Sequence, residues 1–119
     1  MQEARKRAIA AAAITAAMAV PMLVSATPAS AHATCGFNVY DRDSSVPVRS
    51  TRTNVNVRTG SSTGCPVKTV IYAGDLLDFH CWTLGNDGYT WTFLEVKGQQ
   101  GWVRDDLLPG NGSNVSCAS

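Results

Sequence analysis

Beyond residue 31 the sequence lacks any helical pattern. No stretch of eleven residues or more repeats apolar residues at the three-, four- and seven-residue spacing of an amphipathic helix. Short runs rich in β-forming residues lie instead between clusters of Gly, Asn, Asp and Ser. This pattern is typical of a small barrel or sandwich, so we predict an all-β domain.

The same region lacks an excess of positive charge. Residues 1–31 carry Glu3, Arg5, Lys6 and Arg7, which leaves seven Lys or Arg and eight Asp or Glu in the rest of the chain, a net charge of −1. Proteins whose main partner is a nucleic acid usually present a basic patch and a pI above about 9. Nucleic acid is therefore not expected as a partner.

The cysteine and histidine spacings of common zinc sites are missing as well. The sequence has four cysteines and two histidines, but it contains neither a C-x2-C nor an H-x3-5-H pair. His80 and Cys81 are adjacent and cannot easily both face one ion. We expect no metal and no cofactor.

What the sequence does have is an export signal. The basic residues of MQEARKR precede an alanine-rich apolar run over residues 8–24 and then the small residues of SATPASAHA. Residues 29–31 form an A-x-A cleavage site, and residues 31–33 form a second one. A transmembrane anchor is the alternative, but Pro21 interrupts the apolar run. We predict a signal peptide over residues 1–31, cleaved after Ala31 or Ala33, and a secreted protein, extracellular or associated with the cell wall, without stable membrane insertion.

All four cysteines lie beyond this cleavage site, at Cys35, Cys65, Cys81 and Cys117. An even number in a small exported chain implies disulfides. The 88 residues after Ala31 are expected to need them, because the core of so short a chain provides only marginal stability. Three pairings are possible. Domain termini often lie close together, and Cys65 and Cys81 flank a short strand pair, so we expect Cys35–Cys117 and Cys65–Cys81.

Five or so short strands are expected between residues 54 and 108. Val55 and Val57 alternate with polar residues, as a half-buried strand requires. An extension over residues 32–53, in which Pro47 confines any strand to a sheet edge, precedes them, and a tail over residues 109–119 follows. The predicted strands and strand-like runs are 37–40, 54–58, 67–72, 76–84, 89–96 and 101–104, with a hairpin turn at 85–88. Closing these strands into a partly open barrel would hide their edges.

Four segments in this order resemble the bacterial SH3-like (SH3b) domain family: VNVRTGSSTGCPV, AGDLLDF, YTWTFLEV and GQQGWVRDDLL. The N-V-R-x-G-x-S strand and loop of the family corresponds to residues 56–62, its tryptophan strand to residues 91–94 and its G-W-V to residues 101–103. Ser61 and Thr92 depart from the proline and second aromatic that are usual at these places. The resemblance covers about residues 53–108 and implies a small SH3-like, partly open barrel.

The resemblance also implies a binding function. Many members of the family are attached to a cell-wall hydrolase and target it to peptidoglycan. That catalytic domain is not found in this sequence, so we expect a stand-alone, monomeric binding module for peptidoglycan or its peptide. The alternative is an extracellular protein–protein interaction or inhibitory module.

Aromatic side chains carry the predicted ligand site. Flat rings offer apolar area and lose little rotamer entropy on binding. The ligand-binding residues are expected at strand ends or on the outward face, at Tyr72, Trp82, Asn86, Tyr89 and Trp91. The alternative is that these rings cover a core poor in aliphatic residues.

Other residues are assigned to structure. Phe79 and Trp102 are expected in the core. Arg58 could hold an anion, but the resemblance favours hydrogen bonds to loop or strand carbonyls. Gly60 is expected to supply a turn conformation, together with Gly74 and Gly101.

No catalytic site is expected. His80 and Cys81 suggest a Cys–His dyad, but neighbours in a strand point to opposite faces and an exported cysteine is expected to be oxidised. Asp105 and Asp106 have no partner acid that the sequence places at a defined distance. The protein is therefore expected not to be an enzyme.

Overall fold

The structure, a computed structural model, describes residues 32–118, so the predicted signal peptide lies outside the described residues. One antiparallel sheet has the strand order β1-β4-β5-β6-β2-β3. Its strands are β1 (Val48–Arg49), β2 (Val55–Arg58), β3 (Val67–Ile71), β4 (Leu76–Leu84), β5 (Thr90–Val96) and β6 (Gln99–Arg104). Two 3-10 turns, η2 (Asp105–Leu107) and η3 (Pro109–Asn111), follow β6. No helix within residues 32–118 is long and apolar enough to cross a bilayer.

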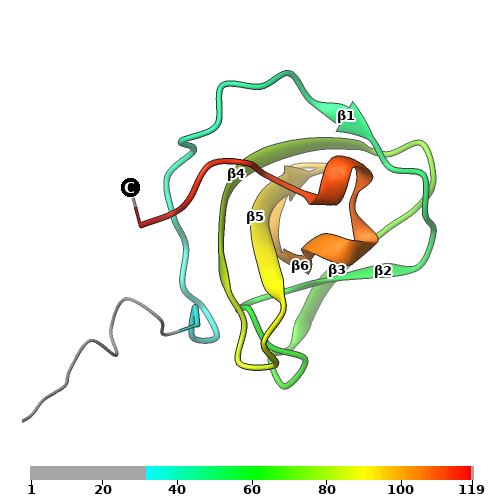
Figure 1. Ribbon diagram of the computed structural model, residues 1–119. Coiled ribbons are helices and arrows are strands. Elements are labelled where there is room, and N and C mark those ends of the chain that lie inside the picture. Colours follow the sequence, from blue (N-terminus) through cyan, green and yellow to red (C-terminus); the bar gives the residue numbers. More distant parts are fainter. Residues whose placement is uncertain (1–31, 119) are drawn as a thin grey trace, which may run out of the picture. The chain divides into compact units, whose positions relative to one another are not determined.

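The sheet curls strongly, and its edge strands β1 and β3 do not pair with each other, so the barrel stays partly open (Figure 1). The predicted fold class, a small all-β barrel with disulfides and no long helix, is confirmed. The run at residues 37–40 forms no strand. The strand of the N-terminal extension is β1 instead, which begins directly after Pro47 and lies at the sheet edge.

The inner face of the sheet holds an aliphatic core. Leu94 and Val96 of β5 face the same cluster as Leu77 and Phe79 of β4, which puts Phe79 in the core as expected. Leu108, between the two 3-10 turns, belongs to the same cluster, and Figure 1 shows these turns in the mouth of the curled sheet. The buried members are Val55, Val57, Ile71, Leu77, Phe79, Leu94, Val96, Val103 and Leu108.

The other face of β5 and β6 carries a second, aromatic cluster of Trp91, Phe93 and Trp102. Ala33 packs into this cluster, and Val39 packs against it. The rings of Phe93 and Trp102 are 5.0 Å apart between centroids and tilted by 60°, an arrangement that aromatic pairs prefer. We call residues 32–47 the N-terminal cover, because they bury this outer cluster.

The cover is fixed to the sheet by hydrogen bonds as well as by packing. The indole Nε1 of Trp102 donates to the carbonyl of Phe37 at 2.8 Å, and the backbone N–H of Arg42 donates to the carbonyl of His80 at 3.0 Å. β5 is therefore apolar on both faces because both faces are covered, and not only because the strand is curled.

The disulfides join Cys35 to Cys65 and Cys81 to Cys117. The expected pairs, Cys35–Cys117 and Cys65–Cys81, are therefore wrong. The two ends of the domain are fastened to different parts of the sheet. The N–H of Gly36 donates to the carbonyl of Thr59 in the loop after β2, at 2.8 Å. The tail pairs with β4, where the N–H of Cys117 donates to the carbonyl of Trp82 at 2.9 Å.

Gly60 is required by close approach and not by an unusual backbone conformation. Its φ is not positive, but a Cβ at this position would lie 2.7 Å from Cys65 Sγ and 2.8 Å from the carbonyl oxygen of Ala33. The cover and the first disulfide thus reach the loop only because residue 60 has no side chain. Of the glycines expected to supply turn conformations, Gly74 has a positive φ of 92°.

A mass spectrum of the non-reduced tryptic digest tests the disulfide pairing. Trypsin separates the four cysteines onto four peptides, because it cleaves after Arg42, Arg58, Lys68, Lys97 and Arg104. We expect one linked pair that contains Cys35 and Cys65 and another that contains Cys81 and Cys117. A peptide that links Cys65 to Cys81 would contradict the structure.

Asp105 is a buried carboxylate at the mouth of the barrel. It is 4% exposed and accepts a hydrogen bond from the hydroxyl of Thr92 at 2.6 Å. That hydroxyl also accepts a hydrogen bond from the N–H of Ser113 at 2.9 Å. Burial raises the pKa of Asp105, and the nearby negative charge of Asp106 acts in the same direction.

Asp105→Asn should therefore change how stability depends on pH. A carboxyl whose pKa is raised on folding contributes stability below the unfolded pKa, and this contribution is lost as the pH rises through the folded pKa. The variant keeps an oxygen for Thr92 but cannot ionise. The free energy of unfolding of the variant minus that of wild type should therefore increase as the pH rises from 3 to 7. Urea denaturation at several pH values measures this difference. A difference that does not change with pH would contradict a raised pKa.

Candidate functional site: a basic groove beside β2

A groove of about 380 Å³ lies beside β2. Its walls come from the segment before β2, from β2 itself, from the loop that follows β2, and from β5, β6 and η2. The lining residues are Arg52, Thr53, Asn54, Val55, Asn56, Arg58, Thr63, Trp91, Arg104 and Leu107. Three of them are arginines and none is acidic, so the groove is positively charged on a domain whose net charge is close to zero.

Arg58 organises one wall of the groove. Its Nη1 donates to the carbonyls of Thr63 and Cys65, both at 3.0 Å. These hydrogen bonds to loop carbonyls are those expected of a structural arginine. A carbonyl carries no full charge, and within residues 32–118 Arg58 forms no ion pair.

Arg104 is held between two partners. Its guanidinium donates to both carboxylate oxygens of Asp106, at 2.7 and 3.0 Å, and lies 4.2 Å from the ring centroid of Tyr89. The hydrogen bond to Asp106 raises the pKa of Arg104. A guanidinium fixed on an aromatic ring keeps a defined orientation, which suits it to contact a ligand at the rim of the groove.

Arg52 provides the free charge of the groove. It is exposed, and within residues 32–118 its guanidinium forms no ion pair. Among the described residues, only one of the three guanidinium groups of the groove has a carboxylate partner. This is Arg104, which pairs with Asp106. A free guanidinium can bind a carboxylate or a phosphate through two parallel hydrogen bonds.

Polar uncharged groups complete the lining. Side-chain amides come from Asn54, directly before β2, and from Asn56 of β2, and hydroxyls come from Thr53 and Thr63. Asn54 has a positive φ of 62°, a conformation that asparagine tolerates better than most residues. Amides and hydroxyls can pair with the backbone of an extended ligand. The groove therefore combines charge recognition with hydrogen bonding along its length.

The five predicted ligand residues do not form one surface. Tyr72 lies at the β3–β4 turn, where Lys97 stands 5.0 Å from its ring centroid. Asn86 and Tyr89 belong to the hairpin at the opposite end of β4. Trp82 is half-buried, and its backbone pairs with the tail.

Trp91 was expected at a strand end or on an outward face. It is instead buried in the outer aromatic cluster, beneath the N-terminal cover. It is 2% exposed, and its Nε1 donates to Asp87 Oδ1 at 3.2 Å. It nevertheless lines the groove. Trp102, expected in the core, is fully buried in the same cluster.

Of the residues that line the groove, only Trp91 was predicted as a ligand residue. Arg58 was assigned to structure, and Arg52 and Arg104 were assigned no role. The alternation of Asn56 and Arg58 with Val55 and Val57 was a readable signal, because it places both polar side chains on one face of β2. The opposite wall comes from residue 104, far along the chain, and only the folded sheet brings it near β2 through the Arg58–Trp102 pairing.

Comparison with protein-family models, with curated proteins and with solved structures finds no match for this chain.

Paired substitutions separate core rings from surface rings. Trp91→Ala should lower the free energy of unfolding by about 3–5 kcal/mol, because it removes a buried ring and leaves a cavity. Tyr89→Ala removes a ring that is 50% exposed and should cost about 1 kcal/mol or less. Chemical denaturation followed by circular dichroism measures both. Equal effects of the two substitutions would contradict the burial of Trp91.

Proposed function

We propose that this protein is a secreted, non-catalytic binding module of the SH3b type, which holds an anionic ligand of the cell envelope in the basic groove. The observation that carries the proposal is the set of three guanidinium groups, at Arg52, Arg58 and Arg104, with a single carboxylate partner among the described residues. A monomer would present the whole groove, because all its walls come from one chain.

The peptide stem of peptidoglycan fits this chemistry. Such peptides are short and extended, and they carry free carboxylates together with amide groups. Arg52 can bind a carboxylate through its guanidinium fork, and Asn54 and Asn56 can pair with amides. Tyr89, stacked on Arg104, offers an apolar ring at the rim, so that one of the predicted aromatic residues keeps a place in the proposed site.

Secretion is supported by the disulfides and by the N-terminal sequence. All four cysteines form disulfides, which persist mainly in oxidising compartments. The basic start, apolar run and A-x-A sites of residues 1–33 have the form of a secretory signal. The SH3b assignment is supported by its four motif segments, which supply β2, the first part of β4, β5 and β6 of the curled sheet.

A second candidate is an extracellular protein–protein interaction or inhibitory module. The observation that favours it is the exposure of large apolar side chains on the N-terminal cover, where Phe37 is 51%, Tyr40 is 86% and Val46 is 79% exposed. Neighbouring exposed apolar side chains are a feature of interaction surfaces. This surface lies outside the basic groove.

Retention on purified cell wall, with a matched pair of variants, tests the first candidate. Arg52→Glu reverses a free charge in the groove and should reduce retention about tenfold or more, equal to a loss of about 1.4 kcal/mol. Lys68→Glu makes the same charge change on β3, outside the groove, and should leave retention nearly unchanged.

Three results would count against this site. They are no retention of the wild-type protein at micromolar concentration, equal losses in the two variants, and a loss confined to Tyr40→Ala. The last result would favour the second candidate and its surface on the N-terminal cover.

A further inference from the structure

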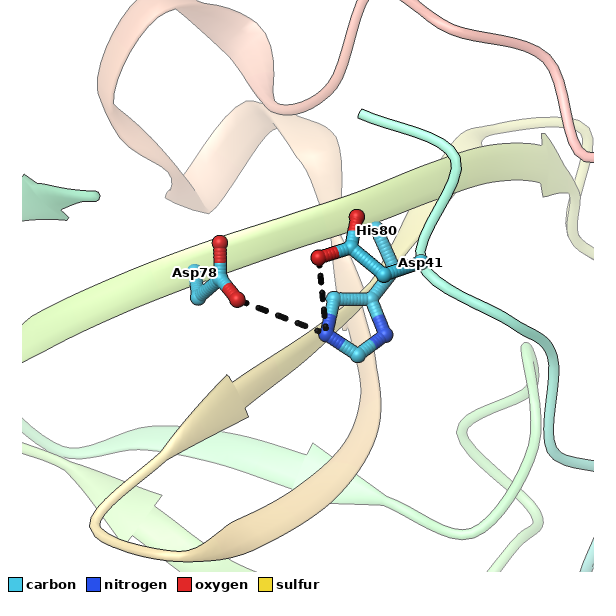
Figure 2. A group of neighbouring side chains, drawn as sticks. All are labelled: Asp41, Asp78 and His80. Atoms are coloured by element: carbon cyan, nitrogen blue, oxygen red, sulfur yellow. Dashed lines mark ion pairs between the residues drawn. The ribbon is translucent and has the colours of Figure 1, made fainter. Parts of the chain in front are cut away.

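A second hollow, lined by carboxylates where the first groove is lined by arginines, lies between the N-terminal cover and β4. It measures about 570 Å³, and its lining includes Asp41 of the cover, Asp78 and His80 of β4, and Glu95 of β5. Figure 2 shows the carboxylates of Asp41 and Asp78 beside the imidazole of His80. Neither lysine nor arginine is among the described residues that line this hollow.

A β-bulge and one backbone hydrogen bond bring these three side chains together. Phe79 and Cys81 pair with the consecutive residues Leu94 and Phe93, so His80 is the extra residue of the bulge. Bulges re-aim side chains and are frequent beside functional sites. The Arg42–His80 backbone hydrogen bond at 3.0 Å then holds the neighbouring Asp41 against β4.

The imidazole of His80 is buried and has no hydrogen bond of its own within residues 32–118. Its side chain is 5% exposed, and Nδ1 is buried without a hydrogen-bond partner. The ring is held by packing, with its centroid 5.5 Å from that of Phe93. Nε2 points between the two carboxylates (Figure 2), at 3.7 Å from Asp78 Oδ2 and 3.9 Å from Asp41 Oδ2. Both distances exceed the length of a hydrogen bond.

These separations are close to those of ligand atoms around one metal ion. The three ligand atoms lie within 4.8 Å of one another. Zinc bonds of about 2.0–2.2 Å in tetrahedral geometry would place ligand atoms roughly 3.4 Å apart. The carboxylates can close the small remaining gap, because the side chains of Asp41 and Asp78 are 43% and 37% exposed. A buried imidazole nitrogen aimed between two carboxylates thus has the donor set and the spacing of a metal site.

We propose that Asp41, Asp78 and His80 bind a divalent first-row transition-metal ion, of which Zn²⁺ is the representative. One imidazole favours such ions over Mg²⁺ and Ca²⁺, which prefer oxygen ligands alone. The hollow leaves room for water or a further ligand to complete the coordination. Since Asp41 belongs to the cover and the other two ligands belong to β4, the ion would also tie the cover to the sheet. This site is independent of the basic groove.

Isothermal titration of the metal-free protein with ZnCl₂, with both disulfides intact, tests the proposal. We expect one equivalent to bind, and binding should weaken about tenfold or more in Asp41→Asn and in Asp78→Asn. Asp41 Oδ1 accepts a hydrogen bond from the N–H of Asp43 at 3.0 Å, and an asparagine keeps this acceptor. Asp41→Asn is therefore expected to fold, which circular dichroism checks. His80→Gln should abolish the one-equivalent binding.

His32→Gln, made in protein that retains residue 32, is the matched control, because His32 is the other histidine of the sequence and lies outside the cluster. It should leave Zn²⁺ binding unchanged, and at the same Zn²⁺ concentration the melting temperature of wild type and of this control should rise more than that of Asp41→Asn. The proposal is overturned by any of four results. These are no binding to wild type at millimolar Zn²⁺, unchanged binding in both aspartate variants, loss of binding in His32→Gln, or tighter binding of Ca²⁺ than of Zn²⁺.

Discussion

The need to cover the outer aromatic cluster constrains the rest of this structure. A small curled sheet can enclose one core, but β5 and β6 also carry Trp91, Phe93 and Trp102 on their other face. Left in water, these rings would form an apolar patch. The N-terminal cover buries them. Its path requires a glycine at residue 60, brings Cys35 to Cys65, and places Asp41 beside β4. Residues before β1 are thus part of the folded domain.

The local features of the fold could be predicted from the sequence, and the features that depend on contacts between distant residues could not. Strands and turns follow from alternation and from Gly and Asn clusters, which act over a few residues. The disulfide pairing depends on where the chain ends cross the sheet. Trp91 shows the same limit, because alternation places it on the face opposite Thr92 without revealing what covers that face. The wall of the basic groove that β2 forms was readable from alternation, whereas Arg104 enters the groove through sheet pairing.

The small net charge of the domain conceals a separation of charge. Arg52, Arg58 and Arg104 gather at one hollow, and Asp41, Asp78 and Glu95 gather at another. Such separation creates local fields that total charge does not report. Composition reports only the total charge, so it could not reveal two small hollows of opposite sign. Both proposed sites use this separation, one for an anionic ligand and one for a cation.

The arrangement of the two disulfides affects how the native pairing can be reached. The first bridge closes a span of 30 residues, and the second closes a span of 36 residues that begins only after the first has ended. The two loops follow one another and do not interlock. If a chain emerges into an oxidising compartment from its N-terminus, Cys35 meets Cys65 before either later cysteine is present. Pairing in order of emergence then yields the native bonds directly, without the slow exchange between thiols and disulfides that interleaved bridges require.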